Sequence, residues 1–162
     1  MRRPDALEAL VELGDDVAGQ PFQWGATDCV ALGLRALACV AVDGAPYLEH
    51  VHWHSFRQAV AAFRDDQVQA WLSGMLAEGE LEEVPVDQVQ AGDVIVGRAL
   101  AGDVYDELEL VDDTRAAWPT VYVQIGSRMV TSDLRAGVSW LSRDQVVDLA
   151  RLRGWRAFRV SV

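Results

Sequence analysis

The chain has 162 residues, of which 51% are apolar and six are tryptophan, enough to bury the core of a single domain spanning 1–162. A formal net charge of -11 at pH 7 opposes the binding of nucleic acids, whose phosphates are held by Lys and Arg. No stretch approaches the ~18 consecutive apolar residues of a membrane span, and no signal peptide precedes the first predicted helix, so we expect synthesis in the cytoplasm without membrane insertion.

Helices are predicted in the first half of the chain. Leucines at helical spacing predict a helix over about 4–17. A second helix is expected over about 27–42, with Thr27 as its N-cap, and its apolar residues on nearly every face are typical of a central, buried helix. Two more helices are predicted over about 55–63 and 66–72.

The second half is expected to form short strands, because β-branched runs alternate there with glycine-containing and acidic turns. The predicted strands are 93–96, 107–111, 120–125, 128–131, 138–141 and 155–160, with one helix over about 143–152. Helices followed by a meander of strands predict an α+β fold with an antiparallel sheet.

The two cysteines, Cys29 and Cys39, fall on the same predicted helix. Ten residues of helix separate them by about 15 Å along the axis, whereas a disulfide needs Cα atoms within about 7 Å. Both are therefore predicted to be free thiols, as in a reducing compartment.

Cys29 is the candidate nucleophile. A cysteine near the start of a helix lies where free N–H groups and the positive end of the helix dipole favour the thiolate. The same N–H groups could hold an oxyanion during acyl transfer, and Gly25 would let the backbone approach a substrate groove closely. Asp28 would disfavour the thiolate unless its side chain points away.

The motif Phe22-x-Trp24-Gly25-x-x-Asp28-Cys29 resembles the nucleophile motif of NlpC-type cell-wall peptidases. Its short spacing is similar to that of uncharacterised proteins encoded among phage tail and gene-transfer-particle genes. Further similarity covers 86–96, 120–126 and 154–160. The resemblance implies a papain-like (NlpC-type) α+β fold, with N-terminal helices packed on a small antiparallel sheet.

The resemblance also implies site residues. Trp24, Gly25 and Asp28 would lie beside the nucleophile, while Trp118 and Thr120 would flank it from the strand that follows. That strand begins with a general-base histidine in active members, but this chain has Thr120 there and no histidine near 131–133. A hydroxyl cannot take up a thiol proton near neutral pH, so Cys29 is predicted to be a remnant or a packed thiol.

The three histidines lie close together as His50, His52 and His54. In an extended segment they would share one face and could bind a metal. Alternatively, His54 could fold back as a base for Cys29, or all three could be exposed in a polar loop with Trp53 packed inward. We favour the polar loop, and expect neither a metal nor another cofactor.

Charged segments suggest surface roles. The acidic segment 102–113 is predicted to be a hairpin that is solvated or docked on a basic partner. Four arginines, by contrast, are expected on solvated outer faces near the C-terminus: Arg151, Arg153, Arg156 and Arg159.

The resemblance leads to one main functional hypothesis, a virion tail-tip or tail-assembly component that acts mainly by docking to other tail or baseplate proteins. An active cysteine peptidase or amidase, which cleaves peptidoglycan stem peptides during phage entry, is the alternative. The third is a metal-dependent or purely protein-binding α+β module that is unrelated to this family, with its motif matched by chance.

Overall fold

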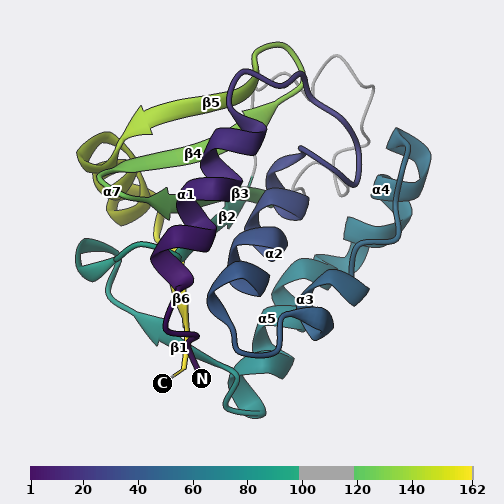
Figure 1. Ribbon diagram of the computed structural model, residues 1–162. Helices are drawn as coiled ribbons and strands as arrows, with labels where there is room; N and C mark the ends of the chain where they lie inside the picture. Colours follow the sequence, from purple (N-terminus) through teal and green to yellow (C-terminus); the bar gives the residue numbers. More distant parts are fainter. Residues whose placement is uncertain (99–118, 162) are drawn as a thin grey trace.

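The computed structural model of the chain describes residues 1–98 and 119–161, in an α+β arrangement (Figure 1). The α-helices are α1 (Ala6–Val17), α2 (Cys29–Val40), α3 (Ala45–Glu49), α4 (Phe56–Phe63), α5 (Gln67–Ala77) and α7 (Arg143–Arg153). The strands are β1 (Leu81–Val84), β2 (Val94–Arg98), β3 (Pro119–Ile125), β4 (Arg128–Asp133), β5 (Gly137–Ser142) and β6 (Arg156–Val160). They form one antiparallel sheet in the order β1-β6-β2-β3-β4-β5.

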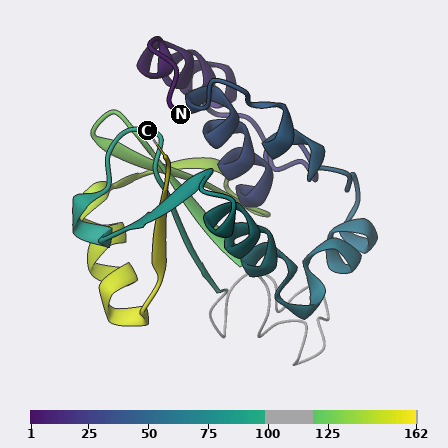
Figure 2. The same cartoon turned by 90° about the horizontal axis from the view of Figure 1, so that it is seen from below.

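Helices cover both faces of this sheet, with α1 and α2 on one side and α7 on the other (Figures 1 and 2). Side chains of β2 alternate between the two layers. Val94 and Val96 belong to the core under α2, whereas Ile95 lies in a smaller core under α7. Both faces of β2 are therefore buried, and this explains why its sequence begins with a continuous run of apolar residues.

The central helix is α2, which is buried along most of its length and packs against β3. Gly33 permits this close approach, because a Cβ atom at this position would lie 2.7 Å from Cγ1 of Val121 on β3. The prediction of a central, buried second helix is confirmed.

A buried ion pair joins two distant segments of the sheet layer. Asp93, only 1% exposed, precedes β2 and accepts bonds from the guanidinium of Arg159 on β6, with a shortest distance of 2.7 Å. Arg159 also donates to the carbonyl of Gln88. The expectation that Arg159 lies on a solvated outer face is thus wrong, because its side chain is only 16% exposed.

Most predicted elements are confirmed to within a few residues, but local patterns missed two. Strand β1 lies in a stretch without β-branched alternation and forms by pairing with β6. Helix α3 follows the predicted helix stop and carries Pro46 in its first turn, where proline costs no hydrogen bond. The predicted strand 107–111 and the acidic segment 102–113 lie outside the described residues. Within 1–98 and 119–161, no helix is long and apolar enough to cross a membrane.

Candidate functional site

The residue that caps α2 is Asp28, one position after the predicted Thr27. Its Oδ1 accepts a bond from the Ala31 N–H at 3.0 Å, while Oδ2 accepts from the Gly25 N–H at 2.6 Å and from the Trp53 indole at 3.0 Å. The Thr27 hydroxyl instead donates to the Pro21 carbonyl at 2.7 Å. Burial raises the pKa of Asp28 above its ordinary value, and these donors offset that effect only in part.

Gly25 has a structural reason to be glycine. Its φ is 73°, and a Cβ atom there would lie 1.9 Å from the carbonyl oxygen of Trp53 and 3.0 Å from Nδ1 of His54. The loop before α4, and not a substrate, therefore makes the close approach to the backbone of Gly25.

Cys29 is the first residue of α2 and is only 5% exposed. Its thiol donates a long, weak bond of 3.9 Å to the carbonyl oxygen of Pro119, at the start of β3. Burial, and next the charge of Asp28, raise the pKa of Cys29 to about 12. The expected lowering by the helix N-terminus is therefore wrong, because desolvation of a buried thiolate outweighs the helix dipole.

The start of β3 lies against Cys29, as the comparison of motifs implied, but it offers no base. Side chains alternate along the strand, so Pro119 shares a face with Val121, which packs toward α2. Thr120 shares the opposite face with Tyr122, which stacks on Trp155 beneath the other core. Thr120 is therefore directed away from the sulfur.

Residues 131–133 are the second place where a catalytic residue would be expected, and the polar side chains there bond to the backbone. The Thr131 hydroxyl donates to the Val121 carbonyl at 2.8 Å. Asp133 accepts bonds from the N–H groups of Arg135 and Ala136, which closes the turn between β4 and β5.

The three histidines contact residues other than Cys29. His50 stacks on Trp71, and His52 makes an edge contact with the fully buried Trp53. His54 is exposed and packs beside Gly25, with its backbone N–H bonded to Gln58. Across the two described ranges, no hydrogen bond joins a histidine ring to Cys29, and no three His, Cys, Asp or Glu side chains form a possible metal site.

Aromatic residues of the motif pack on one another. Trp24 is half-buried between Phe22 and Phe56, with ring centroids 4.6 and 5.9 Å apart. Trp118, the other tryptophan that the resemblance places beside the nucleophile, lies outside the described residues. Trp53 packs inward, as predicted, and its hydrogen bond to Asp28 also makes it part of this site.

Cys29 and Cys39 are both free thiols, as predicted. Cys39 is half-buried and lines a groove of about 880 Å³ between α1 and α3. No local motif in the sequence marks this groove, because its walls come from elements that pack together only in the fold. The sequence signal for it is in 7–12, where Leu7 and Val11 stand next to Glu8 and Glu12, so that apolar and acidic residues share one side of the helix.

In residues 1–98 and 119–161, the Cys29 thiol contacts the Pro119 carbonyl and no histidine ring. The sulfur is buried, which raises the pKa of the thiol, and the neighbouring carboxylate of Asp28 is engaged by three N–H donors. A thiol with no adjacent base attacks carbonyl groups slowly, because the thiolate is the nucleophile. Together, Thr27 and Asp28 fix the start of α2 to the loops at 21–25 and 53–54.

A model of a protein family described as Domain of unknown function (DUF6950) matches residues 1–160. Comparison with curated proteins found no match.

Proposed function

The chain belongs to the family described as Domain of unknown function (DUF6950), and we propose that it is a non-catalytic, papain-like domain that acts by protein docking in a virion tail. In this proposal its partners are other tail or baseplate proteins. The cysteine motif has been kept as the structural start of the central helix. The alternative, an active peptidase or amidase on peptidoglycan, requires a base that Cys29 does not contact in the described residues.

One observation carries the proposal. The Cys29 sulfur lies buried against the carbonyl of Pro119, and its pKa is raised to about 12. At neutral pH about one thiol in 10⁵ would be ionised, from the difference between that pKa and the pH. A buried nucleophile in that state gives negligible attack on a peptide bond.

The neighbouring residues support a structural role. Asp28, Gly25 and Trp53 form a connected set of bonds and close contacts that leaves no space for a substrate beside the backbone of Gly25. An antiparallel sheet packed on a helix that begins with the cysteine is consistent with the papain-like scaffold that the motif implies.

Dye-labelled peptidoglycan tests the catalytic part. We expect equal, background dye release from the wild-type protein and from Cys29→Ser over several hours at pH 6 to 8. Release that depends on Cys29 would overturn the proposal and favour the peptidase. A known cysteine endopeptidase serves as the positive control for substrate quality.

The location is tested on purified particles of the virus or transfer agent whose genes encode this chain. Cross-linkers that react with carboxylates are suitable, because the chain has 25 acidic residues. Cross-linking with them, followed by mass spectrometry, should join the lysine-poor surfaces of this domain to tail proteins. Particles that contain every tail protein except this one would contradict the proposed location.

A further inference from the structure

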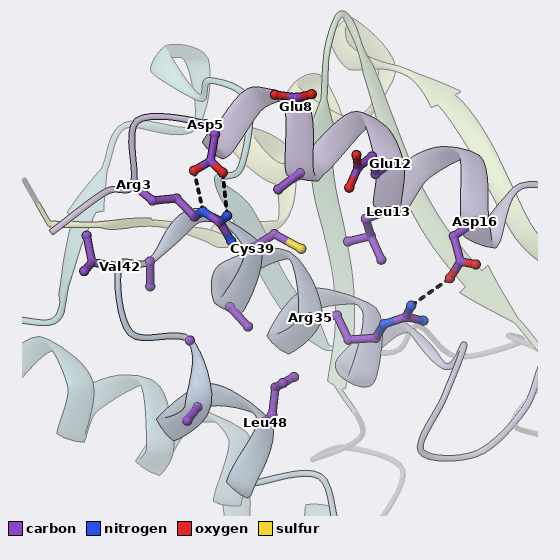
Figure 3. A pocket seen from close by; sticks show the side chains of 15 residues that line it. Arg3, Asp5, Glu8, Glu12, Leu13, Asp16, Arg35, Cys39, Val42 and Leu48 are labelled. Atoms are coloured by element: carbon purple, nitrogen blue, oxygen red, sulfur yellow. Dashed lines mark hydrogen bonds and ion pairs between the residues drawn. The ribbon is translucent and has the colours of Figure 1, made fainter.

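A groove of about 880 Å³ lies on the outer side of α2, between α1 and α3 (Figure 3). We call it the α1–α3 groove. Among the residues that line it are Glu8 and Glu12 of α1, Arg35 and Cys39 of α2, Val42, and Leu48 of α3. It is separate from the surroundings of Cys29, which lies at the buried start of α2.

The charge of the groove is not balanced. Figure 3 shows Arg3 paired with Asp5 near one end and Arg35 paired with Asp16 near the other, at 2.6 and 3.0 Å. Between these pairs Glu8 and Glu12 line the α1 wall, and neither makes an ion pair within the part of the chain that the structure describes. Two carboxylates one helical turn apart therefore remain available to cations.

Exposed apolar side chains surround these carboxylates. Val42 and Leu48 line the groove, while Leu7 and Val11 line an adjoining hollow of about 560 Å³ that shares Glu8 and Glu12. These four side chains are 46% to 61% exposed, and they are four of the six large, exposed apolar residues in the described ranges. Exposed apolar side chains gathered in two hollows that share residues are characteristic of a binding surface.

We propose that the α1–α3 groove binds a basic, amphipathic helix of a partner protein. Helix α1 has 12 residues, about 18 Å at 1.5 Å per residue, which matches about three turns of a bound helix. Apolar residues of that helix would pack on Leu48 and Val42, and its Lys or Arg residues would meet Glu8 and Glu12. This inference rests on the proposed docking role and adds the partner's chemistry.

Charge decides between the occupants of such a groove. A second copy of this chain would bring a net charge of -11 toward Glu8 and Glu12, and like charges oppose that association. A cationic helix would be attracted to the same groove and its approach steered by it. A basic partner is therefore favoured over self-association.

The direct test uses a dye-labelled, 15-residue synthetic peptide of Leu and Lys with leucines at positions i, i+3, i+4 and i+7. Fluorescence anisotropy should report saturable binding that weakens with added salt. A second peptide of the same composition, with its leucines scrambled around the helix, should bind at least about fivefold more weakly if the leucine face reaches Leu48 and Val42. Equal binding of both peptides would overturn the proposal.

Variants locate the binding. Replacing both wall carboxylates, Glu8→Gln with Glu12→Gln, should weaken binding about tenfold through loss of two charge contacts. The control with the same change in charge, Glu78→Gln with Asp148→Asn, alters exposed carboxylates just after α5 and on α7, outside the groove, and should change binding less than twofold. An equal effect of both pairs would show attraction by overall charge alone and would overturn the proposal.

The apolar contact has its own matched pair. Leu48→Ser should weaken peptide binding, whereas Leu152→Ser, at an exposed leucine of α7, should not. Cys39 supplies a native reporter, since bound peptide should slow its alkylation while leaving the wild-type fold intact. Unchanged Cys39 alkylation at saturating peptide would overturn the assigned position.

The two proposals can fail separately. If the Glu8→Gln, Glu12→Gln variant still enters tail particles normally, the groove is not the docking surface, and the proposed location stands. If the peptide binds in the groove but the protein is absent from particles, the groove assignment stands and the tail function fails.

Discussion

The indole N–H of Trp53 donates a 3.0 Å hydrogen bond to the Asp28 carboxylate across 25 positions of sequence. Both side chains are buried, and the same carboxylate caps α2 through the Ala31 N–H. The loop before α4 is thereby fastened to the first turn of the central helix. The Asp of the cysteine motif thus has a structural use that requires no catalysis.

Asp28→Asn should destabilise the fold by about 2–4 kcal/mol. The amide of Asn has one acceptor oxygen in place of two, so in either orientation its nitrogen faces an N–H donor and leaves at least one donor, that of Ala31 or those of Gly25 and Trp53, without an acceptor. Urea unfolding followed by tryptophan fluorescence measures the change. Asp43→Asn is the matched control, because Asp43 accepts a single bond, from Ala45, in an exposed position before α3. Equal losses in the two variants would contradict the role given to Asp28.

Gly25→Ala should destabilise the protein more than Gly79→Ala does. Both glycines have φ near 75°, at 73° and 75°, so both variants carry the strain of a left-handed conformation, about 1–2 kcal/mol. At Gly79 a Cβ atom meets nothing within 4 Å, whereas at Gly25 it would lie 1.9 Å from the Trp53 carbonyl. The difference in free energy of unfolding isolates the clash. Indistinguishable variants would mean that the loop at 53–54 moves without cost.

Cys29 should resist alkylation in the folded protein. With iodoacetamide at pH 8, we expect Cys39, which is half-buried, to be modified first and Cys29 only under unfolding conditions. Peptide mapping by mass spectrometry separates the two thiols. Rapid modification of Cys29 below pH 8 would contradict its buried, protonated state and revive the peptidase hypothesis.

The raised pKa of Cys29 also has a consequence for stability against pH. The folded protein holds the thiol proton more tightly than the unfolded chain, so this contribution is complete below about pH 8.5. It is lost as pH rises toward about 12, the pKa in the folded state. Unfolding free energy should therefore fall between about pH 8.5 and 11, by at most 1.4 kcal/mol per pH unit from this group.

Cys29→Ala is the variant that isolates this effect. Burial also raises the pKa of Tyr47 to about 12, so part of the alkaline loss comes from that residue and persists in the variant. We expect the variant to show a shallower decline than the wild-type protein across the same range. Parallel curves would show that Cys29 ionises normally.

Arg159→Ala should cost about 3–5 kcal/mol, because it leaves the carboxylate of Asp93 buried without its cation. Asp93→Asn alone should cost less, since it removes the buried charge instead of isolating it. The double variant should be more stable than the sum of the two losses predicts, and a double-mutant cycle measures that coupling. A coupling energy near zero would contradict the ion pair.

An exposed ion pair provides the comparison. Arg156 pairs with Glu83 at 2.7 Å, but both side chains are more than a third exposed, so Arg156→Ala should change stability by about 1 kcal/mol or less. The two arginines lie on the same strand, β6, which keeps the local backbone similar. The expected difference therefore reports burial.

Sequence patterns were sufficient for much of the fold. The bounds of α1, α4 and α7 followed from apolar spacing and caps, and the β2 to β5 meander followed from alternating runs separated by turns. Two free cysteines followed from their spacing on one helix. These properties depend on residues that are neighbours in the chain, so they can be predicted from local sequence patterns.

Other features depended on partners that are distant in sequence. Strand β1 forms because β6 pairs with it, since residues 81–84 lack the alternation of apolar and polar residues that predicts a strand. The sequence predicts that Asp28 lies beside the thiol, but its hydrogen bonds to the N–H groups of Gly25, Ala31 and Trp53 depend on the fold. Arg159 could not be placed against Asp93 without knowing that β6 lies beside β2.

The order of residues along the chain determined that Cys29 would begin a buried helix and that a residue other than histidine would stand at the start of the following central strand. Tertiary structure decided the state of the thiol. Packing of β3 over the sulfur removed it from water, and desolvation of a charge outweighs the dipole of the helix that carries it. Local sequence sets the helix end, but only the fold sets the dielectric around it.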